Sequence, residues 1–380
     1  MYKVLDLFSG AGGMAEGFLR AGFSIPYASD ISEQAKNTYV NRHNQLGYDV
    51  VFLNDDLHNI IVDKDTIEEL KKQQFDVIIG GPPCQGFSNA GKRMQEDKRN
   101  QLVKCYLKMI NLIKPKYFVM ENVVGMDSFI FKEFVGISGK VYLDKKITDI
   151  LLEEFDILGY DVNKSILDAS DYGVPQKRRR IFFLGNKKGY ASIKIPKKND
   201  KKITAREALN DLITGDIDSD YQRESVRGRT NSSRKLTVPR EKITNNEKSK
   251  HNKLTVERFK LIKKGQNFKT VFKFLSEEER EKYQTKKNNC RRLSPDTPAP
   301  TVVTLPDDYI HYQEDRILTV RELARLQSFD DSFEFLGKRT TGGLRRKVET
   351  PQYSLVGNAV PPLLAYAVAC CVREAIENDR

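Results

Sequence analysis

Cys84 is the residue of this 380-residue chain whose surroundings best suit a nucleophile. It follows a predicted buried strand in FDVIIGGPPCQGFSNAGK (75–92), directly behind Pro82 and Pro83, which stiffen the backbone and aim the thiol. The attacking form is the thiolate, and an ordinary Cys has a pKa of about 8.5, so arginines or helix-terminal N–H groups must stabilise the negative charge. The alternative is a buried inert thiol, which is our interpretation of the other cysteines: Cys105, Cys290, Cys370 and Cys371.

A carboxylate and two arginines also lie at the ends of predicted strands. Glu121 follows an apolar strand in YFVMENVVGM, one strand along from Cys84, although an acid after a strand is common by itself. Arg178 and Arg180 belong to QKRRRIFFLG (176–185). This basic run leads directly into the apolar strand IFFLG, which weakens its interpretation as an ordinary solvated surface.

The first predicted strand ends in a glycine-rich turn, DLFSGAGGMAEGF (6–18), which precedes a helix. Glycines let the backbone turn tightly and approach a ligand closely, but an ordinary strand-to-helix turn is the alternative, and G-x-G-G departs from the dinucleotide pattern G-x-G-x-x-G. Asp30 ends the second strand, where an acid can hold the two hydroxyls of a ribose, and Asp56 follows the third. Together these residues favour a cofactor that contains a ribose.

The elements that must position these residues alternate between strands and helices up to about residue 185. Apolar runs predict strands at 3–8, 25–29, 50–53, 75–79 and 116–120, and 3.6-residue spacing predicts helices at roughly 14–21, 32–43, 64–72, 99–113 and 145–158. This order predicts an α/β fold with a doubly wound, mostly parallel sheet, Rossmann-like, whose ligands lie beyond the carboxyl ends of the strands.

After residue 186 the alternation ends and lysine, asparagine, serine and arginine become dense. We predict a first domain of residues 1–186 plus 352–380, to which a final apolar helix returns, and a second, smaller, irregular domain of residues 187–351. Its most basic and least patterned part is about 187–290. The chain has 64 Lys and Arg against 52 Asp and Glu, a net charge of +12, which indicates a polyanionic partner unless it reflects a generally Lys-rich composition.

Several classes of protein are disfavoured by the sequence. The longest apolar run (363–372) is about half of the ~20 residues that a membrane span needs, and MYKVLDLFSG does not resemble a secretory leader, so we expect a cytoplasmic protein. Five cysteines, an odd number without a C-x-x-C pair, predict neither a disulfide framework nor structural zinc.

Taken in order, the motifs resemble those of the cytosine-5 DNA methyltransferase family, of the bacterial or phage type with one chain and a target-recognition domain. DLFSGAGG is similar to the family's first motif, GGPPCQGFS to its catalytic Pro-Cys motif and ENV to its glutamate motif. QKRRRIFFLG is similar to its Q-x-R-x-R motif, RRLSPDTPAPTVV with RELARLQSF to the ninth motif, and QYSLVGNAVPP to the tenth. Six matches in the family's order exclude a chance agreement.

The resemblance implies an enzyme that methylates C5 of a flipped-out cytosine in a specific double-stranded DNA sequence, with S-adenosylmethionine as methyl donor. Cys84 would add to C6 and so raise the electron density at C5, while Glu121 would donate a proton to N3 and contact the 4-amino group. Arg178 and Arg180 would bind the O2 edge and the adjoining phosphate. Residues 187–351 would form the target-recognition domain, with the variable region at about 187–290.

The cofactor site implied by the resemblance draws on both ends of the chain, and it needs no metal because the sulfonium already carries positive charge. At Ile31 many family members carry an aromatic residue that stacks on adenine, and here an aliphatic side chain takes that place. The implied cofactor-binding residues are Phe8, Gly10, Gly12, Asp30, Ile31, Asp56, Leu57, Pro82, Leu102, Asn358 and Val360.

The resemblance also implies partners and alternatives. The partner would be double-stranded DNA, bound by a monomer, and a cognate restriction endonuclease of a restriction-modification system could accompany the enzyme without being required. Three alternative functions agree less well with the sequence. A tRNA cytosine methyltransferase would largely lack the long basic region, and an inactive DNA-binding regulator would not keep every catalytic position. A nicotinamide-dependent oxidoreductase would have no use for PPCQ.

Overall fold

The computed structural model describes residues 1–83, 101–285, 287–341 and 349–379, which form two compact units. Unit 1 comprises Met1–Asp168, Arg179–Lys198 and Pro362–Arg380, and unit 2 comprises Ala169–Arg178 and Asn199–Pro361. The chain therefore enters unit 2 briefly before residue 179 and returns to unit 1 for the strand that contains IFFLG. The assignment of functions to the two predicted domains stays a prediction.

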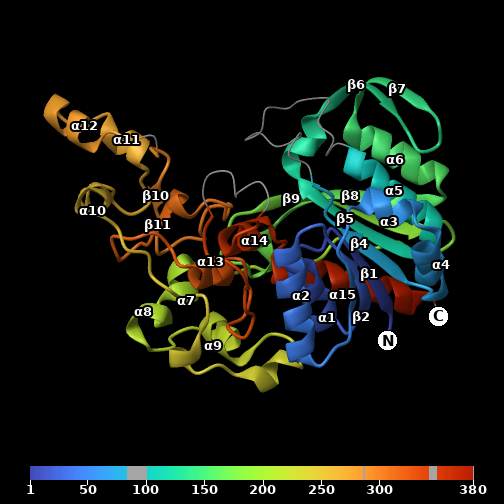
Figure 1. Ribbon diagram of the computed structural model, residues 1–380, viewed down its shortest axis with the longest axis horizontal. Coiled ribbons are helices and arrows are strands. Elements are labelled where there is room, and N and C mark those ends of the chain that lie inside the picture. Colours follow the sequence, from blue (N-terminus) through green and yellow to red (C-terminus); the bar gives the residue numbers. More distant parts are fainter. Residues whose placement is uncertain (84–100, 286, 342–348, 380) are drawn as a thin grey trace. The chain divides into compact units, whose positions relative to one another are not determined.

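Unit 1 is built on a seven-stranded sheet with the order β3-β2-β1-β4-β5-β9-β8 (Figure 1). The first five strands in this order are parallel, and β9 runs antiparallel to both β5 and β8. This confirms the predicted Rossmann-like, mostly parallel sheet. The strands are β1 (Lys3–Leu7), β2 (Ser24–Ser29), β3 (Val51–Leu53), β4 (Val77–Gly80), β5 (Tyr117–Val123), β8 (Tyr160–Asp168) and β9 (Arg179–Lys187).

Helices cover both faces of this sheet, as a doubly wound fold requires. One face carries α3 (Leu57–Val62), α4 (Lys64–Lys72), α5 (Leu102–Ile113) and α6 (Ile147–Ile157), and the other carries α1 (Gly13–Arg20), α2 (Glu33–Leu46) and α15 (Pro362–Asn378) (Figure 1). Helices α1 and α15 touch closely, because a Cβ atom on Gly17 would lie 2.4 Å from the backbone nitrogen of Tyr366. The final helix thus packs on the first one.

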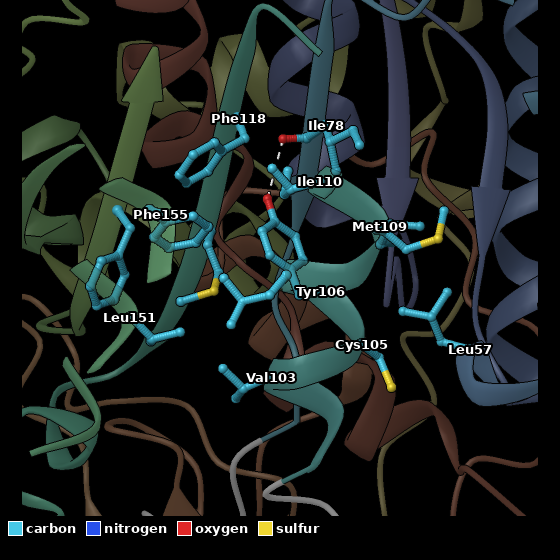
Figure 2. Packing of buried hydrophobic residues seen from close by; sticks show 14 of the residues in the cluster. Leu57, Ile78, Val103, Cys105, Tyr106, Met109, Ile110, Phe118, Leu151 and Phe155 are labelled. Carbon is cyan, nitrogen blue, oxygen red and sulfur yellow. Dashed lines mark hydrogen bonds between the residues drawn. The ribbon is translucent and has the colours of Figure 1, made fainter. Parts of the chain in front are cut away.

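A hydrophobic core of unit 1 lies under α5 (Figure 2). Tyr106 of α5 points at the sheet, and its hydroxyl donates to the carbonyl oxygens of Ile78 at 3.3 Å and Val119 at 3.0 Å. Its ring meets Phe118 edge-on, with centroids 6.3 Å apart. A Cβ atom on Gly80 would lie 2.9 Å from this ring, so glycine at the end of β4 lets α5 pack directly beneath the segment that leads to Cys84.

Several elements differ from those predicted. Strand β5 continues to Val123 because β9 pairs with it along its whole length, from Tyr117↔Asn186 to Val123↔Arg180. A hairpin of β6 (Ile130–Val135) and β7 (Val141–Lys146) precedes α6 and was not predicted; Phe131, Phe134 and Tyr142 are its buried side chains, without the strict alternation that marks a strand in a sequence.

Unit 2 is irregular, with short helices and short strands. The predicted division of the chain into residues 1–186 plus 352–380 and residues 187–351 stays a prediction. Buried ion pairs help to hold it together: Arg325 of α13 donates to the carboxylates of Asp211 and Asp331, at 2.9 Å and 2.6 Å from Nη2. Its helices are α7 (Ala205–Leu209), α8 (Asp211–Thr214), α9 (Asp220–Arg227), α10 (Lys253–Lys260), α11 (Phe268–Phe272), α12 (Glu277–Tyr283), α13 (Val320–Leu326) and α14 (Gln352–Asn358), and its short strands are β10 (Arg291–Arg292) and β11 (Tyr309–Ile310). Single 3₁₀ turns are η2 (Val124–Ser128), η3 (Ala169–Tyr172), η4 (Ser233–Leu236), η5 (Arg240–Lys242) and η6 (Pro306–Asp308), the first of them in unit 1.

One helical stretch among the described residues, Gln352–Asn378, has the length and apolar composition of a membrane span. Most of its apolar window, 67%, is buried inside the protein. A core helix passes the same test, so the stretch is weak evidence for a membrane location.

Candidate active site

The parallel strands of unit 1 bring the predicted site residues of unit 1 to one edge of the sheet. Leu7, Ser29, Leu53, Gly80 and Met120 form a row of paired residues across β1 to β5. Phe8, Asp30 and Gly81 directly follow this row and leave the sheet at the same edge. Glu121 also directly follows the row, but it remains in β5, where it pairs with Phe182 of β9. The carboxyl edge of the sheet is therefore where a ligand of unit 1 would bind.

The turn after β1 is shaped by residues with positive φ. Phe8, Gly10 and Gly12 have φ values of +55°, +53° and +91°. A Cβ atom on Gly12 would lie 2.9 Å from the ring of Tyr39 in α2, so only glycine fits there. A Cβ atom on Gly10 would meet nothing within 4 Å among the described residues, so the backbone faces open space at the point where a ligand would approach.

Asp30 links this turn to the second strand and to α2. Its two carboxylate oxygens accept the backbone N–H groups of Gly10 at 2.9 Å and Ser32 at 2.8 Å. Burial raises the pKa of Asp30, and these two hydrogen bonds oppose that rise. Each oxygen keeps a second lone pair, so the carboxylate can still accept a ribose hydroxyl.

The other predicted cofactor residues of unit 1 have different degrees of exposure. Asp56 caps α3 and accepts the backbone N–H of His58 at 3.0 Å, the main reason why its pKa is lowered, yet its side chain is 41% exposed and can accept a ligand's amino group. Ile31 is 70% exposed, and Leu57 is buried. Pro82 is buried at the end of β4, and Leu102 packs partly buried at the start of α5.

Asp6 was not predicted as a site residue, although it is a buried acid below the turn. The Tyr39 hydroxyl donates to its carboxylate at 3.0 Å, and the Tyr39 ring stacks on His43 with centroids 4.4 Å apart. Burial raises the pKa of Asp6 to about 8. The signal in the sequence is a charged residue inside the apolar run KVLDLF.

We expect Asp6→Asn to change how stability depends on pH. The folded protein keeps a proton on Asp6 up to a pKa of about 8, whereas the unfolded chain loses it near 3.8. Between these values the folded state binds more protons, so the free energy of unfolding should fall as pH rises, by about 1.4 kcal/mol per pH unit from this group. Asparagine cannot ionise, so thermal unfolding of Asp6→Asn measured from pH 5 to pH 8 should lose less stability than the wild type.

The control for this prediction is Asp161→Asn, which removes an exposed carboxylate from β8. It should follow the wild-type pH profile. Parallel profiles for wild type and Asp6→Asn would contradict a buried, protonated Asp6.

Glu121 and Arg180 form an ion pair at the end of β5. Arg180 Nε lies 3.0 Å from Glu121 Oε1, because the antiparallel register places Arg180 opposite Val123. The two side chains are largely buried, with 11% of Glu121 and 13% of Arg180 exposed. A Cβ atom on Gly81 would lie 3.0 Å from Glu121 Oε2, so the glycine leaves room beside the carboxylate.

Asn122 ties this acid to the strand that precedes Cys84. Its side-chain amide donates to the carbonyl oxygen of Pro82 at 3.1 Å, and its own oxygen accepts the N–H of Val123 at 2.9 Å. Cys84 itself lies outside the described residues, so its predicted nucleophilic role stays a prediction. Asn122 is a positioning residue that the sequence showed only as part of ENV.

The remaining predicted residues belong to unit 2. Arg178 is buried, and its guanidinium donates to the carbonyl oxygens of Val302 and Gly357, each at 2.9 Å. These bonds hold three segments of unit 2 together, a role that was not predicted, and its contact with the target base stays a prediction. Asn358 is exposed at the end of α14 and Val360 is buried; their contact with a cofactor stays a prediction as well.

A Rossmann-like sheet with an open glycine turn after β1, acids after β2 and β3, and the Glu121–Arg180 ion pair near the end of β5 has the architecture of a methyltransferase catalytic domain. Residues 2–373 match the family description "C-5 cytosine-specific DNA methylase". The chain therefore belongs to this family, and it is a DNA (cytosine-5-)-methyltransferase.

Individual relatives agree with the family match. The type II methyltransferase M.DdeI of Desulfomicrobium norvegicum is 35% identical, over 99% of this chain and 89% of that protein. The type II methyltransferase M1.HphI of Haemophilus parahaemolyticus is 34% identical, over 99% and 87%. A solved structure, a putative DNA modification methyltransferase encoded within an E. coli prophage, is 26% identical with a TM-score of 0.73 and covers 99% of this chain and 100% of that one.

Proposed function

We propose that the enzyme transfers the methyl group of S-adenosylmethionine to C5 of a cytosine flipped out of a specific double-stranded DNA sequence, through a covalent bond between Cys84 and C6. The observation that carries the proposal is the Glu121–Arg180 pair, 3.0 Å apart at the carboxyl edge of the sheet and next to Gly81. It places an acid and a cation beside the strand end that leads to the thiol.

The residues of unit 1 fit S-adenosylmethionine, which the family and the fold imply. Gly10 faces open space, and Asp30 keeps free lone pairs where a ribose would lie. The Ser9 hydroxyl is buried and has no hydrogen-bond partner among the described residues, so a ligand at this turn would satisfy it. When bound, the cofactor supplies an electrophilic methyl group on a sulfonium. Asp56 would accept the adenine amino group, and Ile31, Leu57, Pro82 and Leu102 would line the remaining surface.

The chain's own residues supply the activation of the base. Thiolate addition of Cys84 to C6 places negative charge on the ring, which Glu121 neutralises by giving a proton to N3, so that C5 becomes nucleophilic enough to take the methyl group. A water molecule would then take the C5 proton, the bond between C6 and the thiolate would break, and N3 would return its proton to Glu121, which restores the ring. Arg180 pairs with the ionised Glu121 before the base arrives. When the base binds, Arg180 would turn to the O2 edge and Glu121 would take up a proton from solvent, which it then gives to N3. Arg178 would support the same edge or the adjoining phosphate.

Target recognition falls to residues 187–351 in this proposal, with the variable region at about 187–290. C5 and C6 are inaccessible inside the base stack, so the cytosine must leave the duplex to meet Cys84. The names of the relatives, type II methyltransferases, support a place in a restriction-modification system with a cognate endonuclease that is not required for activity. We propose a cytoplasmic enzyme that acts as a monomer.

The test is to incubate the purified protein with methyl-labelled S-adenosylmethionine and mixed genomic DNA, and to separate the nucleosides after digestion. Label in 5-methylcytosine supports the proposal, and bisulfite sequencing of the product then reveals the recognised sequence. Label in N4-methylcytosine or N6-methyladenine would overturn it. Label accepted by tRNA and not by DNA would favour the tRNA methyltransferase alternative.

A further inference from the structure

A turn with three lysines follows α10 in unit 2. Lys260 is the last residue of α10, and Lys263 and Lys264 follow within the next four residues. All three side chains are exposed. They line a surface hollow of about 560 Å³, which we call the lysine hollow, together with Ile262, Arg292, Tyr312 and Asp315.

Arg292, a buried residue of β10, fixes the backbone of this turn. Its guanidinium donates to the carbonyl oxygens of Phe259 and Ile262, both at 2.7 Å. Its own backbone accepts the N–H of Gly265 and donates to the carbonyl of Gln266, both at 3.0 Å. The lysines therefore project from a backbone that is already held in place, which lowers the entropic cost of binding a ligand.

The charge of the lysine hollow is strongly positive. Asp315 is the acid among its lining residues, and Arg292 Nη2 lies 2.6 Å from its carboxylate and neutralises it. Within the described part of the chain, none of the three lysines forms an ion pair. Their ammonium groups are thus available to an anion from outside.

We propose that the lysine hollow binds a backbone phosphate of double-stranded DNA. Lysine is a compact point charge that suits phosphate oxygens without demanding one geometry, and phosphate contacts hold a DNA-binding protein in register without reading bases. The proposal rests on the proposed function, which supplies DNA as the substrate, and it identifies the part of unit 2 that touches the DNA backbone.

The test compares the triple variant Lys260→Gln, Lys263→Gln, Lys264→Gln with wild type by fluorescence anisotropy on two duplexes of unrelated sequence at several salt concentrations. The triple variant should bind both duplexes more weakly by a similar factor, and the slope of log Kd against log salt should fall by about 1, as expected for the loss of one phosphate contact. The matching triple Lys→Arg variant should keep wild-type affinity.

The control is a second triple Lys→Gln variant at Lys71, Lys72 and Lys114. These exposed lysines precede β4 and β5, at the sheet edge opposite the site, so this variant loses the same charge but should bind DNA like wild type. Binding of S-adenosylmethionine in the absence of DNA shows that each variant is folded. If the triple variant is not folded, the single variants Lys263→Gln and Lys264→Gln replace it.

Three outcomes would overturn the proposal: affinity and slope equal to those of the control variant, weakening on one sequence alone, or weakening on an RNA duplex without weakening on DNA. Failure here is distinguishable from failure of the proposed function. If wild type places label in 5-methylcytosine and the lysine variants bind DNA normally, the phosphate site alone is wrong. If wild type places no methyl group on DNA, the proposed function is wrong.

Discussion

Cys84→Ser should reduce methyl transfer to background while the protein still binds S-adenosylmethionine and DNA. An alkoxide is much harder to form near neutral pH than a thiolate, so the serine cannot add to C6 and C5 stays unreactive. The measurement is transfer of labelled methyl groups to DNA in a single turnover. A second measurement uses DNA that contains 5-fluorocytosine at the target, on which the wild type should form a covalent complex that survives denaturation and the variant should form none.

The matched control is Cys370→Ser, which changes an exposed cysteine of α15 in the same way. It should keep both turnover and the covalent complex. Near-normal turnover by Cys84→Ser would exclude the covalent mechanism, and loss of both activities in Cys370→Ser would show that the assay reports damage to the fold rather than the chemistry.

The residues at the carboxyl edge of the sheet were predictable, because patterns within a few neighbouring residues of the sequence determine which residues end each strand. Asp30 and Glu121 each come directly after an apolar run, and a parallel sheet brings such positions to the same edge whatever the partners of each strand. The glycine turn is visible for the same reason, since Gly12 is needed by the local backbone and by the neighbouring ring of Tyr39.

Contacts that depend on distant segments were not predictable in the same way. Arg180 meets Glu121 because β9 runs antiparallel beside β5. The local sequence around either residue does not determine which strands pair or in which register they pair. Arg178, two residues earlier, instead bonds to the backbone at Val302 and Gly357. Asp6 and Tyr39 come from different elements, and only the packed structure shows that the acid is buried with the hydroxyl as a partner.

Glu121→Gln should lower kcat by about 10²- to 10⁴-fold, the range that general acid catalysis usually contributes. Glutamine has nearly the same size, and its carbonyl oxygen can still accept the N–H of Arg180, but it cannot give a proton to N3. The affinity for S-adenosylmethionine should change little, because Glu121 lies near the end of β5 and the proposed cofactor residues of unit 1 follow the other strands or begin α5. Single-turnover rates with saturating cofactor and DNA measure the effect on chemistry directly.

Removal of a buried carboxylate from an ion pair can also lower activity by destabilising the fold, because the partner arginine then keeps an uncompensated charge. Glu16→Gln separates the two effects. Glu16 forms a buried ion pair with Arg42 at 2.7 Å, and this pair is distinct from the Glu121–Arg180 pair of the proposed active site. Glu16→Gln should lose thermal stability and keep its single-turnover rate, whereas Glu121→Gln should lose the rate. Equal rates for Glu121→Gln and wild type would remove Glu121 from the chemistry, and the Glu121–Arg180 pair would then serve only to join β5 to β9.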